Sequence, residues 1–437
     1  MPKRYLLIIG AFALSILMWV DRACISAAKG DMQTDLGFSD TEMGWVMSIF
    51  ALGYALFQVP AGSMADRYGP RRVMTSVVMI WSALTALTGV VRGYGAMLLL
   101  RFTFGMGEAG GYPTLARAFT QWLPMNERGI TNSISFSGGR LGAALAMPGV
   151  VALIELLGGW QPTFWFFGAI GIFFAIVWWL LFRDSPESHP AVSAEEAQYI
   201  AENRRAKRDT EKPSPSLDEE RSIGWGEMFA SNNLRLLMFQ YVAHNFTFFF
   251  TVSWFFPYMK ETYKLTSQQT GWYAAAPLLC GVVGNWLAGF TVDRMYSMGR
   301  WRWSRRLPAI CGFVLAAVGM TLCVNMPSAL TAVICMCIAI FGSDMILSPS
   351  WSTCMDIGGS SAGKVSGSMN MIGNLGSFAT SLAFPYLVKW SETNAYLAEW
   401  FEPHEPFFYL AGGLNLLAIF AWCMIRPDVS MKEELAS

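Results

Sequence analysis

Twelve stretches of this chain are apolar over lengths that can cross a lipid bilayer, and this pattern restricts the fold more than any other feature. They cover residues 5–28, 44–65, 73–92, 95–119, 129–157, 162–182, 235–259, 271–292, 307–325, 328–351, 363–388 and 406–425. A helix needs about 20 predominantly apolar residues to span the hydrocarbon core. The pattern therefore predicts an all-α integral membrane protein with twelve transmembrane helices.

The composition agrees with this class and excludes several others. Hydrophobic residues make up 54% of the chain and charged residues 14%, and the formal net charge is zero. A membrane-lipid environment is therefore expected, and no nucleic-acid partner. The eight cysteines show no metal or disulfide spacing. Because no nucleophile–base set or phosphate-binding loop is found either, we expect no enzyme activity, no cofactor and no metal.

One long polar segment divides the chain into two halves. We predict a six-helix bundle over 1–182, a cytoplasmic central loop over 183–234 and a second six-helix bundle over 235–437. Within the loop, "SAEEAQYIAENRRAKRD" places Ser193 three residues before Glu196, which is the spacing of a capping box. This spacing predicts a surface helix, followed by a flexible stretch around "KPSPS".

Basic residues indicate how the chain crosses the membrane. They concentrate in the loops after the second, sixth and eighth apolar stretches, whereas the loops after the first and eleventh are acidic. The positive-inside rule then places both termini in the cytoplasm. The "MPKR" start lacks a signal-peptide cleavage pattern.

A short motif occurs twice, once in each half. "GSMADRYGPRR" follows the second apolar stretch and "GFTVDRMYSMGRWRWSRR" follows the eighth. A glycine such as Gly62 lets two helices approach closely, and an aspartate four residues later can cap a helix N-terminus or pair with a base. We therefore predict a cytoplasmic conformational latch, since two matched copies argue against positive-inside charge alone. Its residues are Gly62, Asp66, Arg67, Asp293 and Arg294.

These motifs resemble the loop signature of the major facilitator superfamily. "WVDRACISAA", "YALFQVPAGSMADRYGPRR" and "LRFTFGMGEAGGYPT" resemble its anion:cation symporter branch, which includes carriers of galactonate, hexuronates, glucarate, sialic acid and vesicular glutamate. "VAHNFTFFFTVSWFFPYMKE" is similar to the sialic-acid carrier segment. The resemblance implies two six-helix bundles that rock around a central cavity, with substrate bound near the midplane. It also implies a monomer in the cell (inner) membrane.

Charged residues inside the apolar stretches are candidates for function. Each costs roughly 2.5 to 3.5 kcal/mol near the bilayer centre on insertion scales. Arg101 and Glu108 are seven residues apart, hence on one helix face. Glu108 can take a proton if an arginine moves away from it, although a fixed Arg101–Glu108 pair is the alternative. The full set is Asp21, Arg22, Arg101, Glu108, Arg140 and Asp344.

Arg22 is the predicted anion receptor, because a guanidinium offers a planar fork to a carboxylate and keeps its charge. The resemblance to galactonate carriers implies that Asp21 and Glu108 carry protons and that Arg22 and Tyr54 line the substrate site. A fixed Asp21–Arg22 pair is the alternative. Arg140 can receive a second carboxylate or pair with Glu108, and no role is assigned to Asp344.

The second half is expected to recognise hydroxyl groups. Asn370 and Asn374 share a helix face, and an amide both donates and accepts hydrogen bonds, which suits polyols. Packing between helices is the alternative. By resemblance, Asn370 and Trp351 contact the sugar acid. His244 and Asn245 are further candidates, although a hydrogen-bonded packing role is common for a membrane histidine.

The sequence thus predicts a proton-coupled symporter that imports a small organic anion, most simply a hexonate, hexuronate or aldarate, by alternating access. A carrier of aromatic or other carboxylates, such as phthalate-type acids, is the alternative, since Phe248, Phe249 and Phe250 can stack on a ring. A non-transporting sensor is disfavoured because the central loop is too short for a signalling domain.

Overall fold

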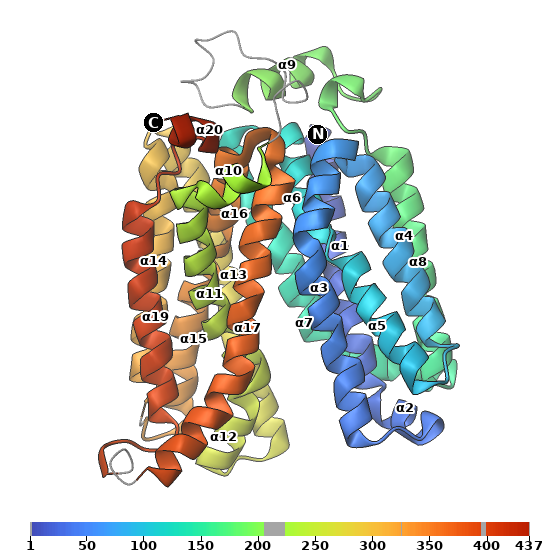
Figure 1. Ribbon diagram of the computed structural model, residues 1–437, viewed down its shortest axis with the longest axis vertical. Helices are drawn as coiled ribbons and strands as arrows, with labels where there is room; N and C mark the ends of the chain where they lie inside the picture. Colours follow the sequence, from blue (N-terminus) through green and yellow to red (C-terminus); the bar gives the residue numbers. More distant parts are fainter. Residues whose placement is uncertain (1, 205–222, 325, 395–398, 437) are drawn as a thin grey trace. The chain divides into compact units, whose positions relative to one another are not determined.

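The computed structural model describes residues 2–204, 223–324, 326–394 and 399–436. All regular structure in these ranges is helical, and no strand occurs there (Figure 1). The predicted all-α fold is therefore confirmed. The stretch around "KPSPS", which we predict to be flexible, lies within 205–222 and hence outside the described residues.

The helices of the first part of the chain are α1 (Arg4–Ala27), α2 (Lys29–Leu36), α3 (Asp40–Tyr68), α4 (Pro70–Thr88), α5 (Tyr94–Glu108), α6 (Gly111–Trp122), α7 (Arg128–Leu157), α8 (Trp160–Leu181) and α9 (Ala194–Asn203). Those of the second part are α10 (Trp225–Ala230), α11 (Asn232–Ser253), α12 (Phe255–Tyr263), α13 (Ser267–Ser297), α14 (Trp301–Leu322), α15 (Ala329–Met345), α16 (Leu347–Gly358), α17 (Ala362–Thr393), α19 (Glu405–Met424) and α20 (Met431–Ala436). Each of the twelve apolar stretches coincides with one long helix or with two shorter ones.

Three stretches that we predicted as single helices are broken, and each break has the same local chemistry. The pairs are α5–α6, α11–α12 and α15–α16. In each pair the third residue of the second helix is a proline, namely Pro113, Pro257 and Pro349. Proline has no N–H to donate to the carbonyl four residues earlier, and its ring clashes there. Prolines also occur inside continuous helices, at Pro60, Pro277, Pro308 and Pro385.

The outer surfaces of the helices are apolar, as contact with lipid requires. On α8, for example, the side chains of Phe173, Leu180 and Leu181 are 67%, 61% and 63% exposed. Among the described residues, seven helical segments are long and apolar enough to cross a membrane unaided, one of which comprises α15 to α17. Exposed apolar surface of this extent is typical of a bilayer-facing protein.

The chain folds into two compact units. Unit 1 comprises Met1–Met125, Ile134–Ile223 and Gly358–Ser368, and unit 2 comprises Asn126–Ser133, Gly224–Ile357 and Met369–Ser437. Residues Asn126–Ser133, from the first half of the sequence, thus belong to unit 2, and residues Gly358–Ser368, from the second half, belong to unit 1. The division at 182 and 235 stays a prediction.

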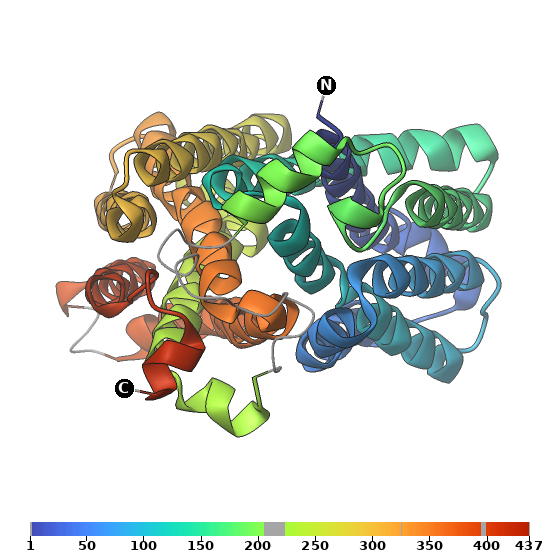
Figure 2. The same ribbon diagram turned by 90° about the horizontal axis from the view of Figure 1, so that it is seen from above.

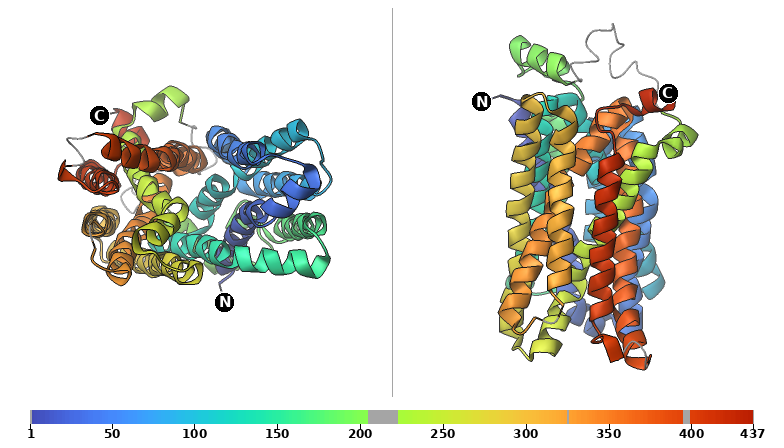
Figure 3. Two further views of the ribbon diagram at one scale, coloured as in Figure 1. Left: turned by 90° about the horizontal axis from the view of Figure 1, so that it is seen from below. Right: turned by 90° about the vertical axis from the view of Figure 1, so that its left-hand side faces the viewer.

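Long helices pack side by side within each unit. In unit 1, α4 packs along α8 and α3 along α5 (Figure 2). In unit 2, α15 packs along both α13 and α14, and α14 also packs along α19 (Figure 3). Glycines bring α14 and α15 close together, because a Cβ on Gly342 would overlap the carbonyl oxygen of Gly312. Such small residues let membrane helices pack backbone against backbone.

The predicted capping box of α9 forms only in part. The hydroxyl of Ser193 accepts a hydrogen bond from the Glu196 N–H, at 3.2 Å. The Glu196 carboxylate instead accepts the backbone N–H groups of Lys3 and Arg4, at 2.9 and 3.2 Å, where α1 begins. Partial burial acts to raise the pKa of Glu196, but these hydrogen bonds outweigh it and lower the pKa. Glu196 thus caps a distant helix and ties α9 to the N-terminus.

Candidate functional site

An ion pair between Arg22 and Glu108 forms the centre of the candidate site in unit 1. The Nε of Arg22, on α1, lies 3.0 Å from both carboxylate oxygens of Glu108, the last residue of α5. The Glu108 side chain is fully buried, and that of Arg22 is 20% exposed. The pair lies beside the α5–α6 break, so a charged group is held where the regular helix stops.

Aromatic rings surround the Arg22 guanidinium. Its central carbon lies 4.5 Å from the ring centroid of Tyr54, 5.3 Å from that of Phe50 and 5.5 Å from that of Trp19. Rings at these distances stabilise a cation through their π faces. Among the described residues, no group accepts a hydrogen bond from the Nη2 of Arg22. The fork therefore has a donor left for a second carboxylate.

Asp21 is separate from this pair although it precedes Arg22 in sequence. Its side chain is 1% exposed, and neither carboxylate oxygen accepts a hydrogen bond within the described part of the chain. The fixed Asp21–Arg22 pair is thus not the arrangement found, because Arg22 bonds to Glu108. The indole of Trp81 lies beside Asp21. The site contains a buried carboxyl group without a donor, which is costly if it is ionised.

Arg101 is buried on α5, two turns before Glu108. Its guanidinium lies over the rings of Phe104 and Phe50, at 4.7 and 5.3 Å. The hydrogen-bonded partner of Glu108 is Arg22, so the fixed Arg101–Glu108 pair left open above is not the arrangement found. Arg140 is buried on α7.

Unit 2 contains a second buried polar cluster. The Nε1 of Trp351 donates to the Tyr241 hydroxyl at 2.9 Å, and the Ser343 hydroxyl lies 2.9 Å from the Nδ1 of His244. The rings of Tyr241 and His244 are 5.2 Å apart, and Phe248 stacks on His244. Thus α11, α15 and α16 bring together polar groups that are about 100 residues apart in sequence.

The predicted asparagines border this cluster. Asn374 donates its Nδ2–H to the carbonyl of Asn370 at 2.8 Å, one turn earlier on α17. Between them, a Cβ on Gly373 would overlap the Tyr241 ring and lie 3.0 Å from the Asn245 amide nitrogen. Asn245 therefore lies where α11 meets α17. Sequence reasoning missed Tyr241 and Ser343, although Tyr241 is one helical turn before His244.

Asp66 and Asp293 each cap the beginning of another helix. The Asp66 carboxylate accepts the N–H groups of Gly363 and Lys364, at 2.9 and 2.8 Å, where α17 begins. The Asp293 carboxylate accepts those of Gly129 and Ile130, at 2.8 and 2.7 Å, where α7 begins. An anion at a helix N-terminus is stabilised by the free N–H groups and the helix dipole.

The glycine four residues before each aspartate permits this approach. A Cβ on Gly62 would overlap the carbonyl oxygen of Gly363, and a Cβ on Gly289 would overlap the Ser133 hydroxyl. The arginines of the motif, Arg67 and Arg294, are exposed. Arg117 of α6 approaches the Asp66 carboxylate, with its Nε 3.9 Å from one oxygen.

A buried carboxylate near the end of α16 was not predicted. Asp356 accepts from the Nη1 of Arg128 at 2.7 Å and from the Nε of Arg305 at 3.0 Å. Both arginines are 1% exposed. Because Asp356 follows the apolar stretch, its sequence position resembles that of an ordinary surface residue. Asp344 is fully buried against α13, where a Cβ on Gly281 would overlap its carboxylate.

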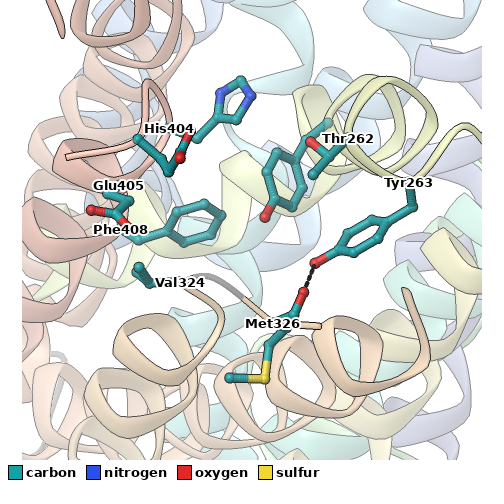
Figure 4. A pocket seen from close by; sticks show the side chains of 9 residues that line it. Thr262, Tyr263, Val324, Met326, His404, Glu405 and Phe408 are labelled. Atoms are coloured by element: carbon teal, nitrogen blue, oxygen red, sulfur yellow. Dashed lines mark hydrogen bonds between the residues drawn. The ribbon is translucent and has the colours of Figure 1, made fainter. Parts of the chain in front are cut away.

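Unit 2 also contains a cavity of about 280 Å³ beside the beginning of α19 (Figure 4). Tyr263 donates to the carbonyl of Met326 at 3.0 Å across one side of it. None of the residues predicted to bind substrate lines this cavity. Its lining residues are Tyr258, Thr262, Tyr263, Val324, Met326, Glu402, His404, Glu405 and Phe408.

Bundled helices with apolar outer faces and ionisable groups inside define a multi-pass membrane protein. Residues 11–381 match the Major Facilitator Superfamily, and the chain belongs to this family of transporters. It is therefore a transporter and not an enzyme.

Several named relatives match along nearly the whole chain. The probable sulfoacetate transporter SauU of Cupriavidus necator is 31% identical over 96% of this chain and 94% of its own length. The probable galactarate/D-glucarate transporter GarP of Escherichia coli strain K12 is 30% identical, covering 98% and 96%. A D-galactonate transporter of Escherichia coli O6:H1 is 28% identical, covering 89% and 90%.

Solved structures confirm the fold. The proton:xylose symporter XylE, bound to 6-bromo-6-deoxy-D-glucose, superposes with a TM-score of 0.73 at 15% identity, covering 99% of this chain and 98% of its own. The human organic anion transporter MFSD10 superposes with a TM-score of 0.68 at 15% identity, covering 97% and 100%. The twelve-helix major facilitator fold is thereby established.

Proposed function

We propose that this protein is a proton-coupled symporter that imports a small organic anion, with sugar acids as the preferred class. The observation that carries this proposal is the Arg22–Glu108 pair, in which the Nη2 of the guanidinium donates to no acceptor in the described part of the chain. The names of the relatives, which include galactarate, D-glucarate, D-galactonate and sulfoacetate, support an anionic substrate.

Arg22 couples the anion to the proton because Glu108 and a substrate carboxylate compete for it. While Glu108 is ionised, it occupies the Nε of Arg22 through both oxygens. A proton on Glu108 neutralises this carboxylate and frees the whole guanidinium fork for bidentate binding of the incoming acid. Arg101 remains on the same helix as a second positive charge near Glu108.

Asp21 takes a second proton in this scheme. Its carboxyl group is buried and has no donor among the described residues. A proton removes the cost of burying its charge. Loading both acids from outside and unloading them inside would then drive import of the anion.

The remaining predicted residues receive their roles within each unit. Tyr54 supports the Arg22 fork, and Arg140 supplies a further buried positive charge for an acid with a second carboxylate. In unit 2, His244, Asn245, Trp351, Asn370 and Asn374 recognise hydroxyl groups. Phe250 packs in a cluster of aromatic rings that includes Phe255, Phe384 and Phe407, so it is occupied by packing and not by a substrate ring.

Alternating access would open and close the caps made by Asp66 and Asp293. Release of either carboxylate exposes the first N–H groups of α17 or α7, so each cap stabilises the state in which it is formed. We place the protein in the inner membrane as a monomer with both termini in the cytoplasm.

A counterflow measurement tests the substrate class. Purified protein in liposomes loaded with unlabelled D-galactonate, galactarate, sulfoacetate or phthalate is diluted into the same acid carrying a radioactive label. We expect exchange of D-galactonate or galactarate, because polyol hydroxyl groups match the amide and hydroxyl groups of unit 2. Exchange of sulfoacetate alone would be consistent with an organic-anion carrier, but it would contradict the assignment of sugar acids as substrates. Exchange of phthalate alone would favour the aromatic alternative.

A further inference from the structure

Gln58 on α3 has a fully buried side chain, 0% exposed, and neither its amide nitrogen nor its amide oxygen forms a hydrogen bond with the described residues. Two other buried amides, Asn285 and Asn415, have an oxygen that accepts no hydrogen bond from the described residues, but their nitrogens donate to Ser133 and Thr247. A buried amide with no partner destabilises a fold, so an apolar residue of the same size would be more stable there.

Gln240 of α11 is a buried glutamine whose amide is hydrogen-bonded within unit 2, and it serves as a comparison for Gln58. It is also 0% exposed. Its Nε2 donates to the Leu237 carbonyl at 2.9 Å, and its Oε1 accepts from Ser350 and Trp422 at 3.3 and 3.2 Å. The contrast indicates that the Gln58 amide serves a partner other than the residues that the structure describes.

The position of Gln58 on α3 relates it to the candidate anion site. Gln58 follows Tyr54 by four residues, so both lie on one face of α3. Tyr54 lies under the Arg22 guanidinium at 4.5 Å. The backbone carbonyl oxygen of Gln58 lies 2.7 Å from where a Cβ on Gly367 would stand, and a turn further on Gly62 contacts Gly363, so α3 packs against the first part of α17 here. Gln58 therefore lies one helical turn from Tyr54, the residue that borders Arg22, and stands between Tyr54 and Asp66 along α3.

We propose that Gln58 is a substrate-recognition residue whose amide hydrogen-bonds a hydroxyl group of the carried acid as the acid leaves Arg22 toward the Asp66 end of α3. The proposal rests on the proposed function, because it takes a hydroxylated organic acid as the substrate. An amide donates and accepts at once, as a hydroxyl group does, so this pairing satisfies both partners. A site that loses such a hydrogen bond discriminates less against acids without hydroxyl groups.

The test compares Gln58→Leu with Gln240→Leu, two fully buried glutamines that differ in their hydrogen bonds. Uptake of D-galactonate and of hexanoate, the six-carbon acid without hydroxyl groups, is measured in liposomes, and thermal unfolding is followed in detergent. We expect Gln58→Leu to keep or raise the unfolding midpoint while kcat/KM for D-galactonate falls about tenfold and hexanoate is unaffected. Gln240→Leu should lower the midpoint by several degrees. Gln58→Met, closer in shape, should behave as Gln58→Leu does.

Two outcomes would overturn the assignment of Gln58 alone. In the first, Gln58→Leu transports D-galactonate as the unaltered protein does. In the second, Gln58→Leu lowers the unfolding midpoint as much as Gln240→Leu, which would make Gln58 a packing residue. If the unaltered protein carries neither acid, nor any other of the counterflow panel, the proposed function fails and this inference fails with it.

Discussion

Replacing Arg22 with glutamine should reduce kcat/KM for the carried anion by about 30-fold to a few thousand-fold. Truncating one partner of a buried, hydrogen-bonded charge pair costs about 2–5 kcal/mol, and about 1.4 kcal/mol corresponds to tenfold. Arg22→Lys should also lose most activity, because an ammonium cannot present two parallel donors to a carboxylate. Initial rates of labelled D-galactonate uptake into liposomes measure the effect.

Two further variants separate lost recognition from lost folding. Arg22→Gln leaves the buried Glu108 carboxylate without its partner, so the double variant Arg22→Gln/Glu108→Gln should fold better and still fail to transport. Arg300→Gln removes an exposed arginine and should transport as the unaltered protein does. Wild-type rates in Arg22→Gln would remove Arg22 from the substrate site.

Asp356→Asn should lower the free energy of unfolding by about 3–5 kcal/mol, because it leaves two buried guanidinium groups without their shared counter-charge. Arg128 and Arg305 both bond to this carboxylate and are 1% exposed. Unfolding in detergent mixtures of increasing sodium dodecyl sulfate, followed by tryptophan fluorescence, measures the change.

Asp428→Asn is the matched control for Asp356. Asp428 lies 3.6 Å from Arg302, but these side chains are 28% and 45% exposed. Exposed pairs contribute at most about 1 kcal/mol, so this variant should unfold nearly as the unaltered protein does. Equal stability of the two variants would show that the Asp356 network is structurally unimportant.

Helix content was predictable from the sequence, because an apolar run of bilayer length satisfies its backbone hydrogen bonds in lipid most simply as a helix. The continuity of each helix was not predictable. Pro113, Pro257 and Pro349 follow breaks, whereas Pro60 and Pro277 lie inside continuous helices. Proline removes the same hydrogen bond in both situations. The presence of a proline therefore does not tell from the local sequence whether a helix continues or stops.

The candidate site shows the same limit. Residue types and spacing identified Arg22, Glu108 and Arg101, but spacing relates residues only within one helix. The partner of Glu108 comes from α1, 86 positions away. Likewise, Trp351 reaches Tyr241 across 110 positions. Asp356 was not predicted, because a carboxylate at the end of an apolar run is common and its two arginine partners are distant in sequence.

Proton movement with the anion tests the central claim most directly. Protein is reconstituted into liposomes that enclose a pH-sensitive dye, no gradient is imposed, and the acid exchanged fastest in counterflow is added outside. The proposed mechanism predicts that the lumen acidifies with the unaltered protein and stays constant with Glu108→Gln. Entry of labelled acid without any change of luminal pH, or equal acidification by Glu108→Gln, would contradict proton coupling through Glu108.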